Sequence, residues 1–137
     1  MAKIVLTDVK VLINSVNLSD HITQISIDQK TDVVETTGMS STGAKTRVAG
    51  LKDNSVTIDF LQDFATSNVE QTIYPLIGTA ATIVISPTSS SNGVVGNPTY
   101  TFSALVSEWK PLDGSIGALA TASVTWNIDG AVTKVAV

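Results

Sequence analysis

The nine residues 121–129, TASVTWNID, alternate strictly between apolar and polar side chains. Successive side chains of an extended strand point to opposite faces of a sheet, so a period of two predicts a strand with one buried and one wet face. The apolar members of this stretch are Ala122, Val124, Trp126 and Ile128. Residues 22–28, ITQISID, and 55–60, SVTIDF, repeat the same period. This shared pattern predicts a sheet fold.

The composition agrees with a β fold in a single domain of 137 residues. The chain has 17 Val and 12 Ile against 9 Leu, and β-branched side chains fit strands better than helices. Because 43% of the residues are hydrophobic, the composition excludes general disorder. No apolar run approaches the roughly 20 residues of a membrane-spanning helix, and no secretory signal is visible, so we expect a soluble chain.

Around these strands, the other segments predict further strands and one helix. Residues 3–13 are rich in Val and Ile and lead into a turn at Asn14-Ser15, which predicts a hairpin with residues 16–18. Further strands are expected at residues 81–86 and 99–109, joined by an exposed flexible loop at 87–98.

One short helix is expected near the middle of the chain. Ser67 and Glu70 have the spacing of a capping box, and apolar residues follow at helical spacing. Gly78 is a natural terminator, and Pro75 should distort the last turn or end the helix early. The expected fold class is therefore mainly β, with two packed antiparallel sheets in a sandwich or partly open barrel and one flanking α-helix.

Residues 29–50, QKTDVVETTGMSSTGAKTRVAG, are too poor in large apolar side chains to build a core. Connections in compact domains usually run about 4–6 residues, so a structureless loop of this length would be functional or disordered. Two interpretations are equally favoured by the residues alone: an arm that docks on a neighbouring subunit, and a mobile hairpin.

The sequence offers no constellation for catalysis or cofactor binding. There is no cysteine, which suits a reducing compartment, and the one histidine, His21, is best interpreted as a turn residue before a strand. The carboxylate pairs Asp59/Asp63 and Asp28/Asp32 are best interpreted as solvated strand-end groups. No glycine forms a phosphate loop, and Lys45 with Arg47 makes only a weak basic spot. We therefore expect no enzyme, metal or cofactor.

Charge also limits the partners of the protein. The charged fraction is only 15%, and 8 basic against 12 acidic residues give a net charge of −4, which argues against clamping nucleic acid. Trp109 and Trp126 lie on expected strands without interleaved basic residues, so packing is favoured over base stacking. With 15 Ser and 18 Thr, most of the polar surface is hydroxyl.

The polar sides of the expected strands contain no Lys or Arg. They comprise Gln24, Ser26, Asp28, Thr57, Asp59, Thr101, Ser103, Thr121, Ser123, Thr125, Asn127 and Asp129. A face of small hydroxyls and scattered carboxylates has little attraction for a polyanion and repels it weakly. The plainer alternative is the solvent face of a monomeric sandwich.

The order of features resembles the major tail proteins, or tail tube proteins, of long-tailed bacteriophages. The resemblance spans about residues 20–130 as short, degenerate motifs. Its elements are the arm ending in 47–53, RVAGLKD; the strand 55–60 with Gln62 and Asp63; the helix 69–78, VEQTIYPLIG; the segment 108–114, EWKPLDG; and the last strand, 122–130.

The resemblance implies a single tail-tube domain that assembles into stacked hexameric rings, a hollow tail through which the genome passes. It implies an inter-subunit arm at about 30–50, with Thr36, Thr37, Gly38, Met39, Ser40, Ser41, Lys45 and Arg47 as candidate contacts. It also implies a lumen, for which the candidate residues are Asp28, Thr57, Asp59, Thr121, Ser123, Thr125, Asn127 and Asp129.

The partners implied are other copies of the chain, other tail proteins (tape measure, terminator and distal tail) and DNA that passes without specific binding, with no membrane contact. The implied location is the virion tail, assembled in the host bacterial cytoplasm. The alternatives are a tail terminator or another ring-forming component, the inner tube of a contractile injection system, and a monomeric carbohydrate- or cell-binding β-sandwich. The last is disfavoured because only 5% of the residues are aromatic.

Overall fold

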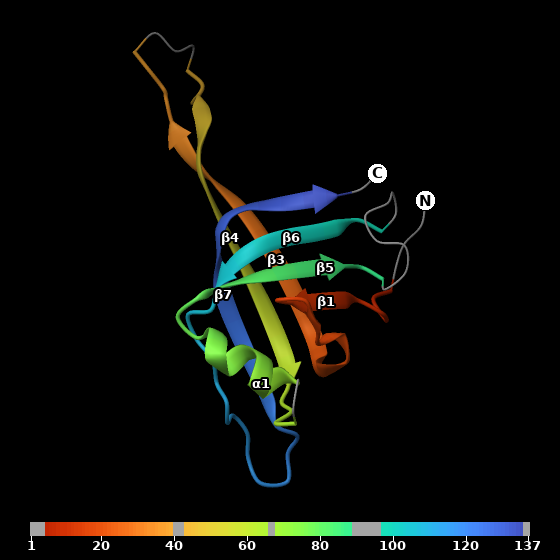
Figure 1. Ribbon diagram of the computed structural model, residues 1–137. Coiled ribbons are helices and arrows are strands. Elements are labelled where there is room, and N and C mark those ends of the chain that lie inside the picture. Colours follow the sequence, from red (N-terminus) through yellow and green to blue (C-terminus); the bar gives the residue numbers. More distant parts are fainter. Residues whose placement is uncertain (1–4, 40–42, 66–67, 89–96, 136–137) are drawn as a thin grey trace.

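The computed structural model describes residues 5–39, 43–65, 68–88 and 97–135 and shows one antiparallel sheet with a short helix on its flank (Figure 1). The strands are β1 (Lys10–Ile13), β2 (Val16–Asn17), β3 (Ile22–Glu35), β4 (Arg47–Leu61), β5 (Ala80–Ser86), β6 (Thr99–Leu105) and β7 (Thr121–Val135). They pair in the order β2-β1-β5-β6-β7-β4-β3. The helix is α1 (Val69–Ile73), and single 3-10 turns form at Ser19–His21 and Tyr74–Leu76.

Strand β7 joins the two halves of the sheet. Its first half pairs with β4, from Leu61↔Thr121 to Ser55↔Asn127, and its second half pairs with β6. Within the part that pairs with β6, residues 130–132 of β7 stand opposite the single residue Phe102, and Gly130 has a φ of +91°. Such an irregularity bends a strand, and Figure 1 shows β7 turning sharply at this point. The mainly β fold with a flanking helix is thus confirmed, with the two layers formed by halves of one open sheet.

The core lies between these halves and uses the alternation seen in the sequence. Val56, Ile58 and Phe60 of β4 are fully buried. All four apolar residues of the 121–129 stretch are buried as predicted. The indole N–H of Trp126 donates to the carbonyl oxygen of Glu108 at 2.8 Å, so burial leaves this polar group satisfied.

Trp109 closes the core at the helix. Its ring packs edge-on against Phe60, with 5.6 Å between ring centroids, and its N–H donates to a carboxylate oxygen of Glu70 at 2.9 Å. Both tryptophans therefore pack against the core, as expected from the sequence. Trp109 itself lies outside a strand, because β6 ends at Leu105 rather than continuing to residue 109.

Turn residues define the small hairpin of β1 and β2. Asn14 and Ser15 both have positive φ, of 48° and 69°, which is the backbone twist of a two-residue hairpin turn. The predicted turn is thus confirmed. The preceding strand is shorter than expected, however, because it begins at Lys10 and the described residues 5–9 lie outside it.

The helix differs from its prediction at the start and agrees at the end. Its N-cap is Asn68, with no side-chain cap. The backbone N–H of Glu70, predicted to donate to Ser67, donates to the carbonyl of Asp63 at 3.1 Å, and the Glu70 carboxylate accepts from Trp109, so the predicted capping box is wrong. Ser67 lies outside the described residues. At the other end, the turn Tyr74–Leu76 is 3-10 around Pro75 and Gly78 follows with a φ of +84°, as expected for a distorted last turn.

The described residues of the segment 28–53, namely 28–39 and 43–53, form a protruding two-stranded ribbon, where the sequence predicted a structureless loop (Figure 1). Strands β3 and β4 stay paired as far as Glu35↔Arg47, and Thr36 donates its backbone N–H to the carbonyl of Thr46 at 2.8 Å. Every described residue of the ribbon is exposed. With both faces in solvent, the ribbon needs no apolar alternation, which is why the sequence pattern misses these strands.

A bulge marks the middle of the ribbon. The register shifts between Thr31 and Val33, where Gly50 lies so close that an added Cβ would meet Val34 at 3.1 Å and Asp32 at 3.2 Å. The glycine therefore permits the close approach of the two strands at this irregularity.

Two further expectations concern segment ends. The last strand continues past residue 129 to Val135. Most of the loop expected at 87–98 lies outside the described residues.

Among the helices of the described ranges, none has the length and apolar character that crossing a bilayer demands.

Replacing Trp126 with alanine is expected to lower the free energy of unfolding by about 3–5 kcal/mol, the usual cost of removing a large buried aromatic side chain. Trp126 is fully buried and touches Phe60. Asn127→Ala, at the exposed neighbouring position, serves as the control and should change stability by less than about 0.5 kcal/mol. Urea unfolding followed by circular dichroism measures both, and equal effects of the two substitutions would contradict the core described above.

Candidate functional site

The outward face of the β3–β4–β7 half brings most of the predicted lumen residues together. The strand registers align them in three rows across the sheet, namely Gln24–Asp59–Ser123, Ser26–Thr57–Thr125 and Asp28–Ser55–Asn127. Side chains also bond across the strands: the Ser123 hydroxyl donates to Asp59 at 2.6 Å, and the hydroxyl oxygens of Thr57 and Thr125 lie 3.2 Å apart. We call these three rows, with Thr121 beside them, the polar face.

Three of the twelve polar-side residues lie elsewhere. Ser103 pairs with Asp129, and Thr101 pairs with Thr133, in the half of the sheet formed by β6 and the second part of β7. Asp129, predicted as a lumen residue, follows Asn127 on the same side of β7 and directly precedes Gly130, but its strand partner is β6 instead of β4. The sequence could not reveal this division, because alternation continues through residue 129 while the strand changes partner.

The polar face carries carboxylates without neighbouring cations until the base of the ribbon. The three rows contain Asp28 and Asp59 and no Lys or Arg. Two residues beyond Asp28, on the same side of β3, Lys30 places its ammonium 3.3 Å from the Asp28 carboxylate. Lys30 thus marks the border of the cation-free surface where the ribbon begins. The sequence pattern missed this cation because the predicted strand ended at Asp28.

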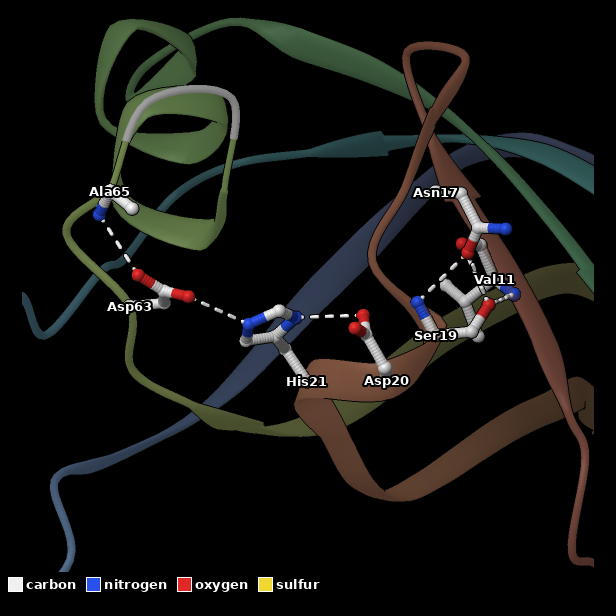
Figure 2. A network of polar contacts seen from close by, with 7 residues as sticks. All are labelled: Val11, Asn17, Ser19, Asp20, His21, Asp63 and Ala65. Carbon is white, nitrogen blue, oxygen red and sulfur yellow. Dashed lines mark hydrogen bonds and ion pairs between the residues drawn. The ribbon is translucent and has the colours of Figure 1, made fainter.

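His21 ties the turn before β3 to the segment after β4 (Figure 2). Its Nδ1 lies 2.8 Å from a carboxylate oxygen of Asp20, and its Nε2 lies 2.8 Å from Asp63. The other oxygen of Asp63 accepts the backbone N–H of Ala65 at 2.9 Å. His21 is the last residue of a 3-10 turn directly before β3, which confirms the interpretation as a turn residue.

These contacts shift two pKa values in opposite directions. Burial lowers the pKa of His21, but the hydrogen bonds with Asp63 and Asp20 and the charges of both carboxylates outweigh it, so the pKa lies above its ordinary value. The pKa of Asp63 is lowered, first by the hydrogen bond from Ala65 and then by His21. The cluster therefore favours the ion pair and links two segments that are 42 residues apart in the chain.

The carboxylate pairs singled out in the sequence have separate partners. Asp59 accepts from Ser123, and Asp63 accepts from His21 and Ala65. Asp28 lies beside Lys30. Within the described ranges, no group of three or more His, Cys, Asp or Glu residues is arranged to hold a metal ion.

The ribbon presents the predicted arm residues to solvent. The described members are Thr36, Thr37, Gly38, Met39, Lys45 and Arg47, whereas Ser40 and Ser41 lie outside the described residues. Lys45 reaches Glu35 at 3.7 Å, and the Met39 side chain is fully exposed. The ribbon also exposes four large apolar residues on its strands, Val33, Val34, Val48 and Leu51.

A second exposed apolar surface escaped sequence reasoning. The segment between β6 and β7 exposes Leu112, Ile116 and Leu119, and the stretch leading to α1 exposes Phe64. A signal was available: large apolar residues recur at i, i+4 and i+7 in 112–119, LDGSIGAL, where two glycines disfavour a helix and the structure has none. Large apolar side chains in a segment that forms no helix or strand have no buried face on which to pack.

The pKa shifts predict how stability depends on pH. Because folded His21 binds its proton more tightly than the unfolded chain, its contribution is complete below about pH 6.5 and is lost as pH rises through the raised pKa. Asp63, with a lowered pKa, contributes above about pH 4 and loses its contribution as pH falls through that pKa. We therefore expect the free energy of unfolding to decrease between about pH 6 and pH 8.

Asp63→Asn tests this dependence, because the amide oxygen still accepts from Ala65 while the charge facing His21 is removed. Urea unfolding at pH 6 and pH 8 should show a smaller difference in the variant than in the wild type. Asp113→Asn, in an exposed loop, is the matched control and should keep the wild-type difference. Equal pH dependence in all three proteins would rule out this role of the pair.

Solved tail and baseplate assemblies contain chains with this fold, whereas no family model and no curated protein matches the sequence. A chain from the virion of a native gene transfer agent particle has a TM-score of 0.75 at 12% identity, covering 94% of this chain and 96% of that chain. A chain from the tail of an empty gene transfer agent particle, computed with helical refinement and C6 symmetry, has 0.63 at 15%, covering 85% and 83%.

A third structure extends the comparison to a baseplate. A chain of the 6-fold symmetrised anti-feeding prophage baseplate has a TM-score of 0.64 at 12% identity, with 99% of this chain and 98% of that chain covered. All three matches span most of both chains. The expected resemblance to phage tail proteins is therefore confirmed at the level of the fold: this chain has a tail-type fold over almost its whole length.

Proposed function

We propose that the protein is a structural component of a phage-like tail, and that copies of it form stacked hexameric rings around a hollow tube. The observation that carries the proposal is the fold, which matches over most of the chain a protein in a helical tail of C6 symmetry. Each protomer would contribute its sheet to the wall of the tube, and DNA would pass through without being bound.

The free edge of β3 supports ring formation. In the described sheet β3 is an edge strand of 14 residues, paired only with β4. A long unpaired edge offers backbone donors and acceptors to another chain and is a liability in a monomer. Joining the sheet of the next protomer would satisfy this edge and continue the sheet around the ring.

The polar face supports a role as the lumen surface. It combines hydroxyl groups with the carboxylates of Asp28 and Asp59, and Lys30 is confined to its border. Proteins hold DNA chiefly through Lys and Arg side chains that contact the DNA phosphates. A surface without these side chains would let the DNA slide past. Asp129, which pairs with Ser103 of β6, stands at the border of the proposed lumen surface.

The ribbon supports contacts between protomers. A two-stranded ribbon with both faces in solvent is marginally stable alone, and this one exposes apolar side chains along its length. Contact with another protomer would bury them. The ribbon residues Thr36, Thr37, Gly38, Met39, Lys45 and Arg47 would then form the inter-subunit arm.

A second candidate function is a ring in a baseplate or at the tube end, or the inner tube of a contractile injection system. The likeness to a chain of the anti-feeding prophage baseplate favours it. Electron microscopy of the purified protein separates tubes from rings: we expect filaments or stacks of rings for a tube protein, of a phage-like tail or of a contractile system, and single rings for a terminator or baseplate ring. A monomer at every concentration would overturn the assignment.

Shortening the ribbon should abolish assembly without unfolding the protein. Glu35 and Arg47 are directly paired, so residues 36–46 can be replaced by Asn-Gly, the two-residue turn that suits a hairpin. We expect the variant to keep the circular dichroism spectrum of the wild type and to remain unassembled in electron micrographs. As a control, Thr133→Ala, at an exposed position outside the ribbon, should assemble like the wild type. Filaments of normal length from the shortened protein would exclude the ribbon as an assembly element.

Labelling tests the position of the polar face. The chain has no cysteine, so Thr125→Cys introduces a single thiol in the middle of that face. In assembled tubes it should react with a small maleimide and be protected from a maleimide attached to a large dextran, whereas the unassembled protein should react with both. Thr133→Cys, on the other half of the sheet, is the matched control. Full reaction of assembled Thr125→Cys with the dextran reagent would place the face outside the lumen.

A further inference from the structure

The exposed apolar side chains of this protein gather at two opposite ends. Of the fifteen large hydrophobic residues exposed in the described chain, five lie in the ribbon and six in residues 62–78 and 106–120. The second group comprises Phe64, Tyr74, Ile77, Leu112, Ile116 and Leu119. We call the described residues 62–65, 68–78 and 106–120 the receiving end.

The same strands connect the two ends. Strand β4 begins in the ribbon at Arg47 and ends at Leu61, beside the start of β7. Directly after β4, Gln62 links the two segments of the receiving end. Its side-chain amide donates to the carbonyl of Pro111 at 2.8 Å, and its backbone N–H donates to the carbonyl of Ala120 at 3.0 Å. Fifteen extended residues span about 50 Å. Figure 1 shows the ribbon and the 106–120 loop pointing away from each other along this axis.

Charge is also divided between the ends. The whole ribbon, 28–53, has four acids and four cations, but its outer part, residues 35–52, carries three cations, Lys45, Arg47 and Lys52, against the single acid Glu35. The receiving end carries the acids Asp63, Glu70, Glu108 and Asp113 against the single cation Lys110. Opposite charges on two apolar surfaces favour their contact and disfavour contact of either surface with its own kind.

We infer that the receiving end is the docking site for the ribbon of a second copy of this chain. The inference rests on the proposed function and names the partner surface of the arm. Copies related by a shift along the strand axis bring the ribbon of one against the receiving end of the next. Such a head-to-tail contact uses two different surfaces and repeats without limit, which is how a stack of rings grows.

Crosslinking tests the contact directly. Met39→Cys with Ile116→Cys places one thiol at each end, both on fully exposed side chains of a chain without cysteine. With a short flexible bismaleimide, the double variant should give a ladder of trimers and longer species on a denaturing gel. Each single variant should give dimers at most. Met39→Cys with Ser123→Cys, which moves the second thiol to the polar face, is the matched control and should give no ladder.

A substitution test measures the effect on stacking. Replacing Leu112, Ile116 and Leu119 with serine changes only side chains that are at least 70% exposed, so the fold should be retained. We expect electron micrographs to shift from filaments to separate rings. Val5→Ser with Val135→Ser, which removes exposed apolar groups outside both ends, should leave filaments intact. Crosslinking remains decisive if the triple variant fails to fold.

The outcomes separate this inference from the proposed function. Two results would overturn the docking site and leave the tube proposal standing. One is that the triple variant forms filaments of normal length. The other is that the Met39→Cys, Ile116→Cys double variant assembles into tubes but, like the wild type, gives no crosslinked ladder. A wild-type protein that stays monomeric would overturn both. A ladder together with loss of stacking supports the inference.

Discussion

The fold depends on β7 serving both halves of the sheet. Its apolar residues fill the core from one side, while its edges pair first with β4 and then with β6. The bend at Gly130 folds the two halves over each other and encloses Phe60 and Trp126. Without that change of partner, the sheet would leave its apolar face open to water. The flank is then closed by Trp109, which packs on Phe60 and holds Glu70 of the helix.

This arrangement also explains where the proposed assembly surfaces lie. Because the core takes the inward side chains of β4 and β7, their outward side chains form a continuous polar face. Because β4 continues past the core, its beginning protrudes as the ribbon and its end carries the receiving end. One long strand thus positions the lumen candidate and both proposed stacking contacts, and His21 fixes the turn beside its end through Asp63.

Prediction from sequence succeeded where one physical signal dominated. Alternation identified the buried side of residues 121–129 and the strand at 55–60, and turn chemistry identified Asn14-Ser15 and Gly78. Prediction failed where no side chain is buried. Both faces of the ribbon are exposed to solvent, so its strands lack the alternation of apolar and polar residues. The capping box failed because both groups of Glu70 that it needs have other partners: the backbone N–H bonds to Asp63 and the carboxylate to Trp109, a residue 39 positions away.

The sequence by itself determined the fold class, the inward and outward sides of each alternating strand and the scarcity of cations on the polar sides. Those properties follow from local periodicity and composition. Only the tertiary structure decided which strands share a face, that β7 changes its partner from β4 to β6 just before Asp129, and that apolar groups gather at opposite ends. These depend on strand pairing and on where β7 changes partner, and pairing joins residues that are far apart in the chain.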